Sequence, residues 1–134
     1  MNLLSNYEIV SIIPGILKAK VKDEDLTIRI FVIPLHVFEN NGKYSVQVTV
    51  ITSVDSNNLK FGEICNPQKM MFHEGVVPQD LELIAKPRLE IKTQDNKIIE
   101  INVEITNIVV FPELRDPSGS PCTVISWTIF QTVN

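Results

Sequence analysis

Two stretches decide the fold: LTIRIFVIPLHVF (residues 26–38) and IEINVEITNIVVF (residues 99–111). In both, apolar side chains recur at every second position over most of the length, which is the period of a β-strand with one buried face. Pro34 interrupts the first stretch. Because proline donates no hydrogen bond to a β-ladder, Pro34 predicts an edge, a bulge or a bend at that point. The two stretches therefore predict two long strands.

The segments around these stretches favour strands as well. Shorter strand-like segments occur at residues 7–13, 16–22, 59–65, 81–85 and 89–92, and alternating segments occur at 44–54 and 123–133. Asn40-Asn41-Gly42 is typical of a hairpin turn, since Asn and Gly accept positive φ. Ile and Val dominate the apolar residues, a bias that favours sheets over helices. We expect one all-β domain over residues 1–134, an antiparallel β-sandwich or a closed barrel.

The order of features repeats in two halves, residues 5–65 and 79–134, which a connector at 66–78 joins. Without a gap, the two long stretches match Ile28 with Ile101 and Val37-Phe38 with Val110-Phe111. The other matches are Pro14 with Pro87, Val46 with Ile125, Val48 with Trp127 and Val50 with Ile129. This repetition predicts two pseudo-symmetric four-strand halves related by a pseudo-two-fold axis. The connector itself is expected to contain one helical turn that ends at Gly75.

Composition limits the classes of function. The 134 residues can bury a core without a disulfide or a metal, and the net charge of −4 disfavours nucleic acid and anionic membranes as partners. The first residues lack the basic start and apolar run of a signal peptide, and no apolar run is long enough to span a bilayer. We therefore expect a soluble, cytoplasmic protein, with a mature secreted form as the alternative. Cys65 and Cys122 are too few for a disulfide scaffold, and we expect free, buried thiols, with a disulfide between them or a nucleophilic role as open alternatives.

No motif points to catalysis. The sequence has no spacing typical of zinc ligands, and neither cysteine has a base or a basic cluster nearby in the sequence. His73 and Glu74 are adjacent, so on an extended segment their side chains point apart and share no proton easily. We expect no catalytic residue, no metal and no cofactor, and hence a protein that is not an enzyme.

Two segments outside the alternating pattern are candidates for partner binding. Met70, Met71 and Phe72 lie in the connector, where they could form an adaptable docking patch or cover an open end of the sheet. Covering the sheet is the preferred interpretation, because an exposed cluster of this kind invites aggregation. Leu114 and Arg115 lie in a predicted hairpin tip at residues 112–121, which three prolines stiffen for recognition.

The sequence thus favours a domain that acts through protein–protein contacts, as a homo-oligomer or as a subunit of a larger assembly. Two alternatives stay open. Lys18, Lys20 and Lys22 line one strand face and could bind single-stranded nucleic acid on an OB-like barrel. A small-ligand-binding β-barrel would instead require an apolar cavity, expected among Met70, Phe72 and Trp127.

Overall fold

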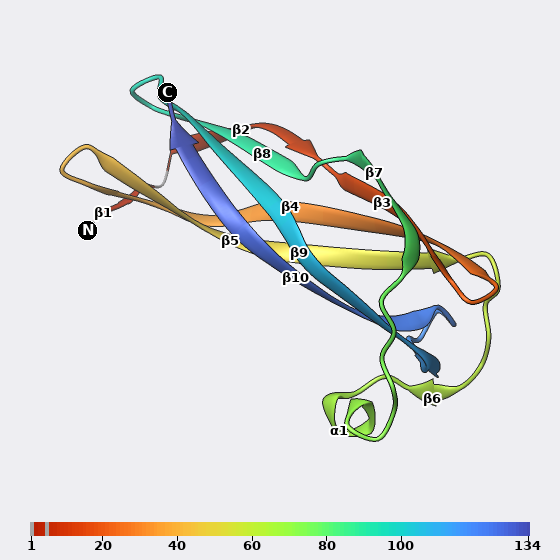
Figure 1. Cartoon of the computed structure of the whole chain (residues 1–134). Coiled ribbons are helices and arrows are strands. Elements are labelled where there is room, and N and C mark those ends of the chain that lie inside the picture. The colour runs from red at the N-terminus through yellow and green to blue at the C-terminus, as the bar shows by residue number, and fades with distance from the viewer. Residues whose placement is uncertain (1, 5) are drawn as a thin grey trace.

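The structure is a computed structural model that describes residues 2–4 and 6–134, and its strands form two sheets that pack face to face (Figure 1). The first sheet contains β1 (Asn2–Leu4), β3 (Gly15–Val21), β4 (Glu24–Asn40), β5 (Lys43–Ser56) and β7 (Gln79–Ala85). The second contains β2 (Tyr7–Ile13), β6 (Glu63–Ile64), β8 (Arg88–Thr93), β9 (Ile98–Arg115) and β10 (Pro121–Val133). The all-β class is confirmed, and of the two predicted architectures the antiparallel sandwich is the one observed.

Each half of the chain contributes to both sheets. β3, β4 and β5 form a meander in the first sheet, and β8, β9 and β10 form one in the second. β2 crosses to pair with β8, while β7 crosses to pair with β3. The crossing chains meet at Gly15 and Pro87, where a Cβ on Gly15 would lie 2.6 Å from Cδ of Pro87. Only glycine permits so close an approach, so Gly15 fixes the point at which the sheets exchange strands.

The pairing registers of the two halves correspond closely. Leu17 pairs with Ile28 in the first half, and Leu89 pairs with Ile101 in the second. A register shift interrupts the β4–β5 pair beside Pro34, so of the edge, bulge or bend predicted there the bulge is observed. Two shifts interrupt the β9–β10 pair, at Pro121/Cys122 and at Ser126/Trp127, and the second leaves Thr106 of β9 unpaired. Val50 pairs with Val32, and Trp127 pairs with Ile105. The register therefore makes Val50, two residues from the predicted Val48, the equivalent of Trp127.

The core consists of two apolar clusters, one toward each end of the sandwich, and Ile105 packs against both. Alternate residues of the long strands point inward, as the sequence pattern predicts. The buried members of the first cluster are Leu17, Val21, Leu26, Ile28, Ile30, Ile108 and Val110. Those of the second are Val32, Val37, Leu89, Ile91, Ile99, Ile101 and Val103. Because β4 and β9 contribute to both clusters, the two halves of the chain form one continuous hydrophobic core.

The turns and the connector follow local chemistry. Asn41 and Gly42 have φ values of 51° and 79°, which confirms the predicted hairpin. The predicted strand at 59–65 is reduced to β6, because this segment leaves β5 and its only strand pairing is with the end of β9. The connector therefore starts near residue 57. The predicted helical turn is α1 (Pro67–Met70), which the Asn66 side chain caps. It ends at Met70, with Met71 as its C-cap, rather than at Gly75.

Candidate protein-binding site

The connector exposes large apolar side chains to solvent. Met71 and Phe72 are 82% and 86% exposed, Met70 is half-buried, and Phe61 is fully exposed. Figure 1 shows β6 and α1 at one end of the sandwich, beyond the main sheets. The expectation that this cluster covers the sheet is therefore wrong for Met71 and Phe72. We define the connector surface as Leu59, Phe61, Ile64, Met71 and Phe72, all of which are exposed.

Sequence reasoning missed Leu59 and Phe61 because it placed them in a strand. The signal that could have found them is the break in alternation after Asn57-Asn58, followed by Gly62. Such a break is typical of a loop rather than of a strand.

Leu114 and Arg115 do not lie on an exposed tip. Leu114 is completely buried and Arg115 is 4% exposed, so neither side chain is available to a partner. The physical reason is that β9 continues to Arg115, and β6 pairs with its last two residues. Only residues 116–120 form the turn. The prediction that Leu114 and Arg115 bind a partner directly is corrected accordingly.

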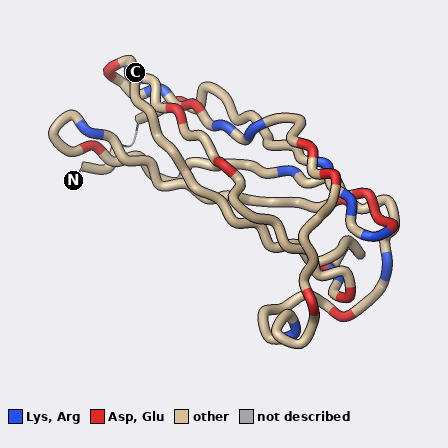
Figure 2. Tube along the Cα trace, viewed as in Figure 1, with Lys and Arg blue, Asp and Glu red and all other residues tan. Residues whose placement is uncertain are grey.

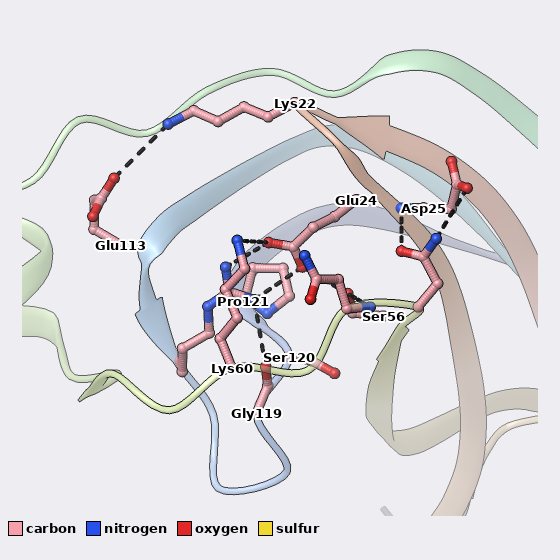
Figure 3. Close-up of polar contacts among 12 residues, drawn as sticks. Lys22, Glu24, Asp25, Ser56, Lys60, Glu113, Gly119, Ser120 and Pro121 are labelled. Carbon is pink, nitrogen blue, oxygen red and sulfur yellow. Dashed lines mark hydrogen bonds and ion pairs between the residues drawn. The ribbon is translucent and has the colours of Figure 1, made fainter.

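Arg115 instead forms a buried ion pair with Glu24, at the start of β4. Arg115 Nη1 donates to Glu24 Oε2 at 2.9 Å, and Nη2 donates to Oε1. The hydroxyl of Ser56 also donates to Glu24 Oε2 at 2.6 Å, and Lys60 Nζ lies 3.7 Å from Oε1 (Figure 3). We call this group the Glu24–Arg115 clasp. It joins the first sheet to the end of the second.

The electrostatics keep both members of the clasp charged. Burial by itself raises the pKa of Glu24, but hydrogen bonds from Arg115 and Ser56 and the charges of Arg115 and Lys60 outweigh burial and leave the pKa below its ordinary value. The hydrogen bond to Glu24 raises the pKa of Arg115. A charged, multiply hydrogen-bonded pair of this kind fixes geometry, because either partner alone would be a buried charge.

The clasp and a disulfide anchor the first part of the connector. Lys60 N donates to Gly119 O at 3.0 Å, and Cys65 N donates to Arg115 O at 3.0 Å. Cys65 is joined to Cys122 by a disulfide with a Cα–Cα distance of 5.7 Å, so the expectation of free thiols is wrong. The two cysteines are 57 residues apart, and only the pairing of β6 with β9 brings them together. Nothing in the local sequence signals that pairing.

The lysine stripe has acidic neighbours. Lys18, Lys20 and Lys22 are all exposed, but only Lys18 and Lys20 lie on β3, whereas Lys22 belongs to the turn that follows it. However, Lys18 pairs with Glu82 and Lys20 with Asp25, while Lys22 Nζ lies 3.8 Å from Glu113 Oε1. Figure 2 shows the two signs of charge interspersed along this part of the chain. A mixed surface attracts a polyanion weakly, and the nucleic-acid alternative stays a prediction.

His73 lies near Glu63 rather than sharing a site with Glu74. Its Nε2 is 3.8 Å from Glu63 Oε2, and both residues belong to the connector. Over residues 2–4 and 6–134, no three His, Cys, Asp or Glu side chains gather closely enough to hold a metal ion. The arrangement offers an ion pair between two segments of the connector when His73 is protonated.

An apolar cleft of about 340 Å³ lies between β7 and β9. Its apolar lining includes Leu17, Leu81, Leu83, Ile105 and Ile108. Met70, Phe72 and Trp127 do not line it, so the cavity expected among those three residues is not the one observed. The volume is at the lower end of the range for small-molecule sites, and the small-ligand alternative stays a prediction attached to this cleft.

Comparison with known proteins adds no family to this description. The chain matches no protein-family model, and neither a curated protein nor a solved structure matches it. The function therefore has to be inferred from the surfaces described above.

Proposed function

We propose that this chain is a non-enzymatic β-sandwich domain that acts through protein–protein contacts, as a homo-oligomer or as a subunit of a larger assembly. The observation that carries the proposal is the exposure of Phe61, Met71 and Phe72 on the connector surface. Large aromatic side chains and Met are enriched where proteins bind one another, and Met adapts its shape to the partner. The expected partner presents an apolar surface.

The anchoring of the connector supports this proposal. The disulfide and the Lys60–Gly119 hydrogen bond anchor its first part, and Val76 N and Val110 N each donate to the other's carbonyl at 2.8 Å at its far end. A loop held at several points loses little conformational freedom when a partner binds. Exposed apolar residues on an anchored loop therefore favour a preorganised binding surface over an incompletely packed hydrophobic core.

We also propose that the two halves arose by duplication. Support comes from the ends of the long strands, where Leu4 pairs with Val37 and Val76 forms a bridge with Val110. Val37 and Val110 are matched positions in the ungapped comparison of the two stretches. The end of the connector is thus the counterpart of β1. If the two halves only shared the two-residue period of any β-strand, the matched residues would not have to pair with corresponding segments.

The cytoplasmic location stays a prediction. Among the described residues, no helix has the length and hydrophobicity to cross a membrane. The Cys65–Cys122 disulfide is typical of oxidising compartments, and it weighs against the cytoplasm.

A photo-crosslinking experiment tests the proposed surface. A photoreactive phenylalanine analogue is placed at Phe72 and, as a matched control, at Leu35, which is also exposed but lies on β4. In cells that naturally express the chain, we expect the Phe72 position to yield a discrete cross-linked protein whose yield falls when unlabelled chain competes. Equal yields at the two positions, or no cross-linked protein at Phe72, would contradict the proposal.

A further inference from the structure

The two longest outer strands of the sandwich, β5 and β10, differ in how their outer edges are protected. In the part of the chain that the structure describes, β5 pairs with β4 alone and β10 with β9 alone. An edge strand presents unpaired N–H and C=O groups, and natural proteins usually protect it with charge, bulges or a covering group. The outer edges of β5 and β10 can therefore be compared by the charges, bulges and covering groups that protect them.

The edge of β5 is covered at one end. Gln131 Nε2 donates to Tyr44 O at 2.7 Å, and Val46 N donates to Gln131 Oε1 at 3.3 Å. Lys43 and Asp55 add a charge near each end of β5. One side chain of β10 therefore occupies edge groups of β5, and the terminal charges further disfavour strand addition there.

The edge of β10 has no protecting charge, and β5 approaches it only near Gln131. Residues 117–134 contain no Lys, Arg, Asp, Glu or His, and Figure 2 shows the trace that leads to the C-terminal label without charge. Large apolar residues of β10 are partly exposed on both faces: Val124, Trp127, Ile129, Phe130 and Val133. A long, uncharged, apolar edge is where another strand adds most readily.

We infer that β10 is the site at which a second copy of this chain adds, with the two β10 strands pairing antiparallel about a two-fold axis at Thr128. The inference rests on the proposed function in one respect, that the chain acts through protein contacts, but it uses a different surface. The second sheets of the two copies would form one continuous sheet.

The register follows from what is accessible. Cys122 is buried in the disulfide, so the free edge runs from residue 123 to 133, and its centre is Thr128. An antiparallel pair centred there places Trp127 opposite Ile129 twice and Thr128 opposite itself. Opposed residues then belong to the same face, so the inward side of the sheet continues across the axis.

The chemistry of this pairing points to a second copy as the occupant. Aromatic residues opposite β-branched residues are favourable cross-strand pairs, and here the partly exposed Trp127 and Ile129 supply each other's partners. No like charges meet, because β10 has none. A self-complementary strand meets the requirement of an isologous two-fold interface, in which the same patch serves both copies.

Light scattering after size exclusion tests the inference on the full chain. The wild-type chain is expected to be a dimer at low and at high salt, since no charges mediate the contact. Thr128→Lys places two like charges opposite each other and is expected to weaken dimerisation by about 100-fold or more. Thr49→Lys is the matched control, because Thr49 lies on the outer face of β5, and it is expected to remain dimeric.

A second variant keeps the test independent of any folding defect in Thr128→Lys. Thr128→Cys is close to the native size, and in the proposed register its two Cβ atoms lie about 4.5–5.5 Å apart across the axis. Oxidation is expected to link two chains covalently, whereas Thr49→Cys is expected to stay unlinked. A monomeric wild-type chain, an unchanged Thr128→Lys dimer or equal cross-linking of the two cysteine variants would overturn the inference.

The connector variants separate this inference from the proposed function. Met71→Ser combined with Phe72→Ser is expected to leave the β10 dimer intact, because neither residue is on β10. If that double variant is monomeric while Thr128→Lys is dimeric, the connector surface is the self-contact and the β10 inference fails. If the photo-crosslinking at Phe72 fails while the β10 dimer persists, only the connector proposal fails.

Discussion

Among the polar contacts that join the two sheets, one at each end of the sandwich can be compared, and these two differ in burial. The Glu24–Arg115 clasp links β4 to the end of β9, and both side chains are about 5% exposed or less. At the other end, the Tyr44 hydroxyl of β5 donates to Asp95 Oδ2 at 2.6 Å, in the turn between β8 and β9, and this hydrogen bond is exposed. Both contacts connect the two sheets, but the free energy of breaking them differs. The buried contact costs more to break, because its groups cannot be solvated by water instead.

The exposed contact still affects ionisation. A hydrogen bond from Thr93, followed by the one from Tyr44, lowers the pKa of Asp95. The same contact with Asp95 raises the pKa of Tyr44. Water can replace either partner at an exposed site, so we assign this contact a role in ordering the turn. The clasp, in contrast, holds an anchored connector and cannot be rehydrated without opening the sandwich.

Removal of one member of the clasp is expected to have the largest effect. Arg115→Met leaves the Glu24 carboxylate buried without its main partner, and we expect it to lower the free energy of unfolding by about 3–5 kcal/mol. Urea denaturation monitored by circular dichroism measures this change. Tyr44→Phe, the matched change at the other end, is expected to shift the urea midpoint far less.

The double variant is the control for the Arg115→Met result. Arg115→Met combined with Glu24→Leu replaces the pair by apolar side chains, and we expect it to be much less destabilised than Arg115→Met alone. A double variant as unstable as the sum of its single variants would show that the two side chains do not act as a pair.

Loss of the disulfide is expected to have the next largest effect. Cys65→Ser combined with Cys122→Ser frees the first part of the connector, and we expect it to lower the free energy of unfolding by about 2–4 kcal/mol. Non-reducing peptide mapping of the wild-type chain checks that Cys65 and Cys122 are linked. A wild-type chain whose thiols alkylate without prior reduction would contradict the pairing.

The sequence predicted the strands well because alternation is a local signal. The long stretches, the bulge at Pro34, the Asn41-Gly42 turn and the helical turn after Asn66 all depend on neighbouring residues. The site depends on distant ones. Arg115 was placed on an exposed tip because its buried partner, Glu24, is 91 residues away. Cys65 and Cys122 were expected to be free for the same reason.

The pH dependence of the clasp gives the smallest effect and the most specific one. Because the pKa of Glu24 is lowered on folding, its stabilisation is complete above the unfolded-state pKa of about 4.3 and is lost as the pH falls through the folded-state value. The stability of the wild-type chain should therefore decrease more steeply below about pH 4.3 than that of Glu24→Gln. Urea midpoints measured from neutral to acidic pH test this difference, with Tyr44→Phe as the control.

The stability of Tyr44→Phe should follow the wild-type curve closely. The pKa of Asp95 is also lowered, but the hydrogen bond that Tyr44 donates to it is exposed. If the curves for wild type and Glu24→Gln ran parallel at acidic pH, folding would not lower the pKa of Glu24, and the clasp would not stabilise its charged carboxylate.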